Sequence, residues 1–138
     1  IFRIFSMTKP IVSVGVMMLI EEGKIQLDDP IKSHLPQLAD LKVLVDEEKV
    51  IAKREPTVRD LLRHTAGFTY GFFGTSKVDL LYFQAGILSK ANDTAAFLEK
   101  VASLPLAYHP GEEWVYSISV DLQGALIEHI SGQSLDRF

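Results

Sequence analysis

Ser6-Met7-Thr8-Lys9-Pro10 leads directly into the apolar run Ile11 to Ile20, and this junction is the most informative part of the 138-residue sequence. The run predicts a helix from about Ser6 to Glu22 that stops at Gly23. Because a membrane span needs about 20 apolar residues, twice the length of this run, we expect no transmembrane segment here. The run is apolar on all sides, which predicts a helix buried on most of its surface.

Ser6 and Lys9 are three residues apart, so on a helix their side chains lie on one face, one turn from each other. A serine hydroxyl needs a nearby base to act as a nucleophile, and a lysine can help where burial lowers its pKa. We expect that burial to come from apolar neighbours, namely Phe2, Phe5, Met7 and Ile11. The free N–H groups of the first helical turn can stabilise a developing oxyanion. Taken alone, the pair also fits an ordinary helix start with a solvated lysine.

Helix and turn signals along the rest of the chain predict a mostly helical protein with one β-hairpin. Asp29 and Pro30 are expected to cap and begin a short helix. The hairpin strands are expected near residues 42–46 and 50–53, with the turn at Glu47-Glu48. Four later patterns are typical of helices, at residues 57–64 with a capping box from Thr57 and Asp60, 76–88, 93–104 with Asn92 or Asp93 as the cap, and 120–130. A glycine-containing aromatic loop separates the first two of these, at residues 66–75.

Composition excludes several classes of protein. Hydrophobic residues make up 47% and charged residues 23%, which is close to the globular average and unlike a disordered chain. The net charge of −4 comes without a basic patch, so no nucleic-acid partner is expected. The chain has no cysteine, and its four histidines lack metal-ligand spacing, so we expect no disulfide, metal or cofactor. The compartment stays open between cytoplasm and periplasm.

Tyr116 strengthens the case for Ser6 and Lys9, because it lies just before a predicted helix and after a turn at Pro110-Gly111. Here the sequence resembles the serine β-lactamase and penicillin-binding-protein superfamily, above all class C β-lactamases and family VIII carboxylesterases. The resemblance rests on stretches in the family's order: Ser6 to Pro10, Thr57 to Phe68, and Pro110 to Ser117 followed by Gly124 to Glu128 and Ser131 to Leu135.

The resemblance implies a role for each matching residue. Ser6 would be the acylated nucleophile, and its backbone N–H would be one oxyanion donor. Lys9 would hold the hydroxyl and help relay its proton, and Tyr116 would take and return that proton. Which of the two is the formal base stays open. His64 belongs to a segment that is mainly structural in the family, and we expect it to be a helix-end residue with local hydrogen-bond partners.

Two departures from the family pattern bear on the substrate. Lactamases and peptidases usually carry Asn two residues after the tyrosine, where this chain has Ile118, which cannot bind a substrate amide. The family's third motif, on a strand of the main sheet, does not occur after Tyr116. The resemblance therefore implies a serine hydrolase acting on a small-molecule carboxylic ester. A β-lactam or D-alanyl peptide substrate is the alternative, as is a non-catalytic penicillin-binding or sensor paralogue.

The implied fold is α+β, the β-lactamase/DD-peptidase-like fold, in which an antiparallel sheet flanked by helices adjoins a helical lobe. We expect residues 1–138 to be a partial domain, truncated at both ends, that holds the nucleophile helix and the helical lobe. Without most of the main sheet, these residues are expected to be inactive alone and to expose apolar surface. Four aromatic residues are candidates either for an acyl pocket or for ordinary packing: Tyr70, Phe72, Phe73 and Trp114.

Overall fold

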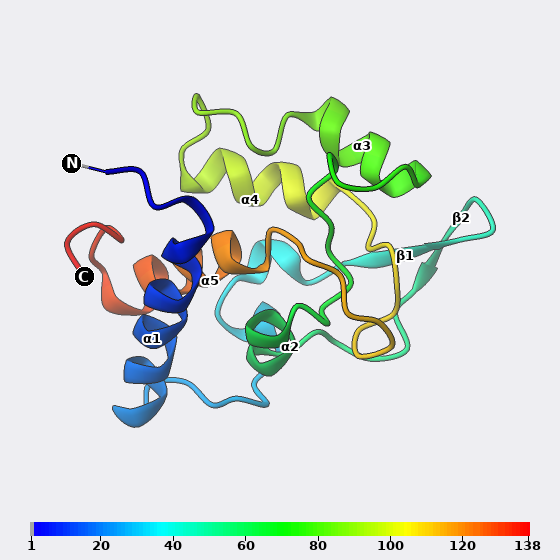
Figure 1. Cartoon of the computed structure of the whole chain (residues 1–138). Helices are drawn as coiled ribbons and strands as arrows, with labels where there is room; N and C mark the ends of the chain where they lie inside the picture. Colours follow the sequence, from blue (N-terminus) through cyan, green and yellow to red (C-terminus); the bar gives the residue numbers. More distant parts are fainter. Residues whose placement is uncertain (1) are drawn as a thin grey trace.

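The structure is a computed structural model that describes residues 2–138. The central element of its fold is α5 (Ser119–Ser131). α5 packs against α1 (Thr8–Glu21) on one side and against α2 (Val58–Arg63) on another (Figure 1). Most of its residues are buried, including the run Leu122 to Ile127. The hydrophobic core therefore lies around α5, and the elements that surround α5 fix the position of α1.

Shorter elements complete the chain. Within residues 2–138 they are three 3-10 turns, η1 (Phe5–Met7), η2 (Ile31–Ser33) and η3 (Pro36–Leu38), the strands β1 (Lys42–Val45) and β2 (Glu48–Ile51), and the helices α3 (Lys77–Ala85) and α4 (Thr94–Ser103). The hairpin projects from one side of the helical body (Figure 1). This composition confirms the expectation of a mostly helical chain with one hairpin. No helix in this described part of the chain is long and apolar enough to cross a membrane.

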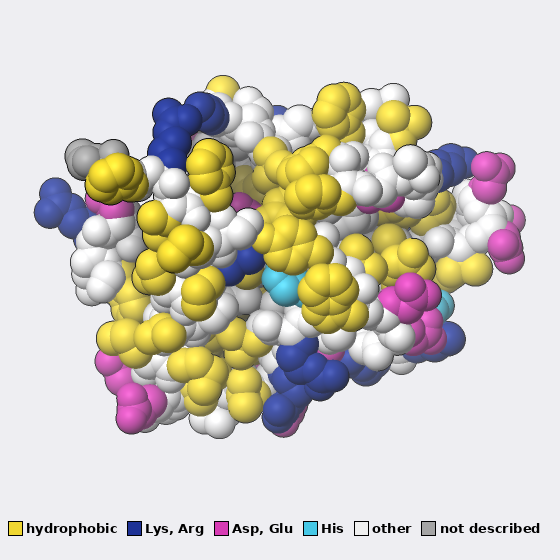
Figure 2. Space-filling view, in the orientation of Figure 1, with side chains coloured by type: hydrophobic (Ala, Val, Ile, Leu, Met, Phe, Trp, Pro, Cys, Tyr) yellow, Lys and Arg dark blue, Asp and Glu magenta, His cyan; other side chains and the backbone are white. Residues whose placement is uncertain are grey.

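Only one face of α1 is buried, so the prediction of burial on most of its surface is wrong for this part of the chain, whereas the expectation of exposed apolar surface is confirmed. The buried residues are Val12, Gly15, Val16 and Leu19, which follow helical spacing and face the core. The opposite face is exposed, at Ile11 (63%), Val14 (59%), Met17 (46%) and Met18 (45%). Hydrophobic side chains accordingly gather on the surface over α1 (Figure 2). α5 covers one side of α1, and no other element within residues 2–138 covers the other.

The hairpin turn is formed by Asp46 and Glu47, one residue earlier than predicted. β1 and β2 pair antiparallel with Val45 opposite Glu48, which leaves a two-residue loop. Both loop residues have positive φ, 46° and 71°, as a tight turn that matches the strand twist requires. Two backbone bonds with Leu106 then tie β1 to the segment that follows α4.

Local capping signals confirm three of the predicted helix starts. Thr57 and Asp60 form the predicted capping box at α2, and Ser76 forms another at α3. Asp93 accepts a hydrogen bond from the N–H of Ala96 at the start of α4. These bonds satisfy N–H groups that have no partner inside the helix.

The predicted helix start at Asp29 and Pro30 is wrong. Pro30 has ψ 133°, which is extended rather than helical, and it pairs with Thr57 in an isolated antiparallel bridge. The Asp29 carboxylate instead accepts from the N–H of Gln26 and lies 3.0 Å from His34 Nε2. Long-range pairing with the chain before α2 therefore overrides the local signal, and only the 3-10 turn η2 follows.

Gln123 links three helices at the centre of the core. Its side chain is fully buried, and its Oε1 accepts from the Ser13 hydroxyl of α1 at 2.9 Å. Its Nε2 donates to the Leu61 carbonyl of α2 at 3.1 Å. Since a buried amide is stable only with such partners, this bridge fixes α1 and α2 relative to each other. The candidate site includes Lys9, from the first turn of α1.

Candidate active site

Ser6, Lys9 and Tyr116 converge on one hydroxyl group. Ser6 lies in the 3-10 turn η1, and Lys9 lies in the first turn of α1, from which its Nζ donates to Ser6 Oγ at 3.4 Å. The Tyr116 hydroxyl, from the segment just before α5, donates to the same Oγ at 2.7 Å. The structure thus brings together the three side chains that the sequence singled out, although Tyr116 is 110 residues from Ser6.

The backbone before Ser6 is bent sharply. Phe5 has φ 46°, a left-handed conformation that costs about 1 kcal/mol or more for a residue with a Cβ. The first bond of the turn runs from the N–H of Met7 to the carbonyl of Ile4. The N–H of Ser6 precedes that bond in the chain, so it has no acceptor inside the turn.

The charge on Lys9 differs from the expectation. The residues expected to bury Lys9 are exposed: Phe2 (93%), Phe5 (80%), Met7 (70%) and Ile11 (63%). Partial burial acts to lower the pKa of Lys9, but interaction with the phenols of Tyr116 and Tyr70 outweighs it and raises that pKa. The ammonium lies 4.6 Å from the ring centre of Tyr116 and 5.3 Å from that of Tyr70. Lys9 is therefore a stable cation, and the prediction that burial lowers its pKa is wrong.

The pKa of Tyr116 shifts in the opposite direction to that of Lys9. Its pKa is lowered, first by hydrogen bonding with Lys9 and then by the hydrogen bond with Ser6. A phenol beside an ammonium ion gives up its proton more easily, because the cation stabilises the phenolate. The Ser6 hydroxyl therefore contacts both a protonated lysine, Lys9, and a phenol of lowered pKa, Tyr116.

His64 ends α2, as expected, and its N–H bonds to that helix, but its carbonyl and side chain bond to the Tyr116 segment, so the expectation of purely local partners is wrong. It ends α2 in a left-handed conformation with φ 56°. Its carbonyl accepts from the N–H of Val115 at 2.9 Å, and its Nδ1 accepts from the N–H of Ser117 at 3.2 Å. Its ring centre lies 5.1 Å from that of Tyr116.

Aromatic side chains surround Tyr116 on the protein surface. Tyr70, Phe73 and Trp114 have ring centres 5.3, 5.8 and 6.3 Å from that of Tyr116, and the ring of Phe72 lies 4.2 Å from that of Phe73 in a tilted arrangement. Phe72 (53%), Phe73 (68%) and Trp114 (66%) are exposed, which excludes ordinary core packing for these three. They form an apolar wall beside Tyr116, whose hydroxyl bonds to Ser6.

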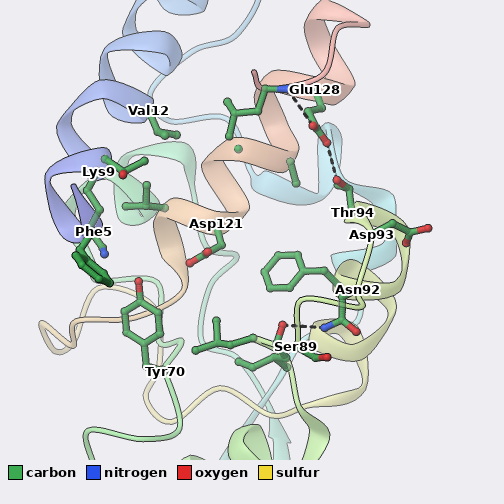
Figure 3. A pocket seen from close by; sticks show the side chains of 18 residues that line it. Phe5, Lys9, Val12, Tyr70, Ser89, Asn92, Asp93, Thr94, Asp121 and Glu128 are labelled. Atoms are coloured by element: carbon green, nitrogen blue, oxygen red, sulfur yellow. Dashed lines mark hydrogen bonds between the residues drawn. The ribbon is translucent and has the colours of Figure 1, made fainter. Parts of the chain in front are cut away.

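A cavity of about 440 Å³ opens next to Lys9 (Figure 3). Lys9, Tyr70 and Asp121 line one end, and Asn92 and Thr94 line the other. Partial burial of its carboxyl raises the pKa of Asp121, although the residue as a whole is exposed. A cavity of this volume holds a small organic group. Residues 2–138 contain no cluster of His, Asp or Glu suited to a metal ion.

The sequence did not single out Asp121 or the contact of Tyr70 with Lys9. Asp121 lies in the first turn of an otherwise buried helix, five residues after Tyr116, and a polar residue in that position is the signal that could have indicated it. Ile118 is fully buried, so it offers no group to a bound substrate.

Comparison with known proteins shows the family of the chain. The sequence model of the beta-lactamase family matches residues 1–138. The chain belongs to the beta-lactamase family. Among relatives in this family, the esterase EstB of Burkholderia gladioli is 36% identical over 98% of the chain and 33% of its own length. The lovastatin esterase of Penicillium rubens is 29% identical over 96% of the chain and 34% of its own length.

Solved structures give the same family assignment. EstCE1, described as a hydrolase with promiscuous acyltransferase activity, superposes with a TM-score of 0.77 at 28% identity, over 96% of the chain and 34% of its own. Simvastatin synthase (LovD) from Aspergillus terreus superposes with a TM-score of 0.73 at 28% identity, over 93% and 32%. The predicted β-lactamase-like fold is therefore confirmed. The chain spans about a third of the length of the curated relatives it matches.

Proposed function

We propose that the protein is a serine hydrolase that forms an acyl-enzyme on Ser6 and acts on carboxylic esters. The observation that carries this proposal is the convergence of Tyr116 Oη, at 2.7 Å, and Lys9 Nζ, at 3.4 Å, on Ser6 Oγ. A serine becomes a nucleophile when a base lies within hydrogen-bond reach and a third group orients that base. Tyr116 fits the first requirement, and Lys9 fits the second.

In the proposed acylation step, the Tyr116 phenolate accepts the proton of Ser6 as Oγ attacks the ester carbonyl carbon. The raised pKa of Lys9 and the lowered pKa of Tyr116 favour Tyr116 as the base and Lys9 as the cation that stabilises the phenolate. The N–H of Ser6 donates to the developing oxyanion. Tyr116 then returns its proton to the leaving alcohol. Water later attacks the acyl carbon with Tyr116 again as the base, and Tyr116 passes that proton to Ser6 Oγ as the acyl–Oγ bond breaks and the acid leaves.

Two observations support an ester over a β-lactam or a D-alanyl peptide. Ile118 stands where the lactamase pattern has Asn, and its burial leaves this position without a partner for a substrate amide. Two of the matched relatives carry the names of esterases. Lactam or peptide hydrolysis and a non-catalytic penicillin-binding role remain the alternatives that share the same acylation chemistry.

Acyl transfer to an alcohol is a second candidate, because an apolar wall of exposed aromatic rings lies beside Tyr116, which bonds to the Ser6 hydroxyl. Such a wall binds an organic acceptor and disfavours water near the acyl group. EstCE1 and several fungal relatives are named for acyl transfer. Added alcohols that divert the acyl group into a new ester at the expense of free acid would favour this function.

We further propose that residues 1–138 form part of a larger hydrolase domain. The relatives are about three times as long, and the third motif that the resemblance implies would lie on a strand of the main sheet. That strand would add the remaining wall of the site.

The test is hydrolysis of p-nitrophenyl butyrate by the full-length protein and by its Ser6→Ala variant. We expect the variant to lose at least about 1,000-fold in kcat/KM, since the nucleophile is removed. Ser103→Ala is the matched control, because this exposed serine ends α4, far from the site in sequence and fold. Equal turnover by Ser6→Ala and wild type would refute the proposal. Faster turnover of a chromogenic cephalosporin than of the ester would refute the substrate class.

A further inference from the structure

Tyr116 is held on both sides by a single residue. The N–H of Val115 donates to the carbonyl of His64 at 2.9 Å, and the N–H of Ser117 donates to His64 Nδ1 at 3.2 Å. Ser117 Oγ lies 3.2 Å from the same nitrogen. These bonds fix the peptide groups of both neighbours of Tyr116, so they restrict where its side chain can point.

The conformation of His64 makes this double contact feasible. With φ 56° and ψ 36°, the left-handed geometry ends α2 and turns the residue away from the helix axis. The N–H of His64 still bonds to α2, and Thr65, the next residue, bonds to the buried Asp60 carboxylate. The backbone that carries His64 is therefore anchored in the core. Residues with a Cβ adopt this conformation rarely, and Asn tolerates it better than most.

The hydrogen bonds also define the protonation state of His64. Nδ1 accepts from a backbone N–H, so it carries no proton, and the neutral ring holds its proton on Nε2. Burial, followed by the positive charge of Lys9, lowers the pKa of His64 and favours this neutral form. The acceptor for Ser117 is consequently present at neutral pH.

We propose that His64 is a positioning residue that holds the Tyr116 hydroxyl against the Ser6 hydroxyl. Its consequence for catalysis rests on the proposed function, but the positioning itself does not. The ring of His64 lies 5.1 Å from that of Tyr116, which adds a packing contact to the two backbone bonds. A misplacement of about 1 Å in a catalytic group lowers the rate by about 100-fold. Loss of the ring should therefore reduce the rate and weaken the contact of Tyr116 with Lys9.

Two variants of the full-length protein separate this role from a general effect on folding. His64→Gly keeps the left-handed backbone, and with it the carbonyl bond to Val115, but removes the acceptor for Ser117. His64→Asn keeps the backbone preference and places an amide oxygen near the position of Nδ1. The phenol pKa of Tyr116 is measured by NMR with tyrosine labelled at Cζ, and Tyr116→Phe assigns the signal.

We expect the phenol pKa of Tyr116 to rise toward its ordinary value of about 10 in His64→Gly and to stay near the wild-type value in His64→Asn. With the butyrate ester, kcat should fall about 10- to 100-fold in His64→Gly with KM nearly unchanged, and His64→Asn should recover most of it. An unchanged phenol pKa in His64→Gly would overturn the proposal, and so would equal losses in both variants. If the phenol pKa of Tyr116 rises in His64→Gly but not in His64→Asn, and the wild-type protein has no ester turnover, the positioning role is supported and the proposed function is refuted.

Discussion

The hydrogen bonds of Asp60 stabilise the end of α2 that leads to His64, and their contribution to stability can be tested quantitatively. Its side chain is almost fully buried, and it accepts from Arg54 Nη1 at 2.5 Å and Nη2 at 2.8 Å. The hydroxyls of Thr57 and Thr65 add bonds of 2.9 Å each, and the N–H of Thr57 adds one of 3.0 Å. Because Thr65 follows His64 directly, this network supports the residue that contacts the Tyr116 segment. Replacing Asp60 by Asn removes the charge with little change in shape.

The expected magnitude follows from the pKa of Asp60. Burial acts to raise this pKa, but the bonds from Arg54, Thr57 and Thr65 outweigh it and lower the pKa from 3.8 to about 2. At about 1.4 kcal/mol per pKa unit, ionisation of Asp60 stabilises the folded protein by about 2 kcal/mol. The pKa is lower in the folded than in the unfolded state. The stabilisation is therefore complete above pH about 4 and is lost as the pH falls through about 2.

Urea denaturation of the full-length protein between pH 2 and pH 7 measures this effect. Asp60→Asn should lower the free energy of unfolding by about 2 kcal/mol or more at pH 7, and the difference from wild type should narrow as the pH approaches 2. Asp28→Asn is the control, because Asp28 pairs with Arg59 on the exposed surface and should change stability little. A difference between Asp60→Asn and wild type that stays constant from pH 7 to pH 2 would refute the electrostatic account.

Two other predictions concern Gly67, in the loop that follows α2, and Tyr116, the proposed base. Gly67→Ala should destabilise the protein by about 2 kcal/mol or more, because Gly67 has φ +91° and an added Cβ would lie 2.3 Å from the Tyr108 carbonyl oxygen. Gly86→Ala, with φ +61° and open space, should cost only about 1 kcal/mol, and equal unfolding midpoints for the two variants would contradict the steric argument. For the base, kcat/KM for the ester should rise with pH through the pKa of Tyr116, which must lose its proton to act. Lys9→Met should move that rise to higher pH, and an unchanged pH profile would exclude Lys9 as the group that lowers the pKa of Tyr116.

Features that depend on nearby residues were predictable from the sequence. The capping box of Thr57 and Asp60 and the cap at Asp93 each involve residues three positions apart, so the sequence contains the whole signal. The end of α5 at Gly132 is of the same kind, since a left-handed residue there favours glycine. The spacing of Ser6 and Lys9 likewise placed both side chains on one side of the first helical turn.

Features that depend on distant residues were not predictable in this way. The apolar run of α1 gave no sign of which face α5 covers, and it led to an overestimate of burial. The pKa of Lys9 depends on Tyr70 and Tyr116, which lie far along the chain, and hydropathy near Lys9 pointed in the opposite direction. The partners of His64 follow it by about 50 residues, so only the fold reveals them.

The central claim is that Ser6 becomes acylated, and intact mass spectrometry of the full-length protein tests it most directly. The protein is mixed with p-nitrophenyl butyrate and quenched in acid within milliseconds to seconds. The account predicts a transient mass increase equal to one butyryl group, mapped by peptide analysis to Ser6 and absent from Ser6→Ala. A butyryl adduct on another residue, or ester turnover by Ser6→Ala at the wild-type rate, would contradict it.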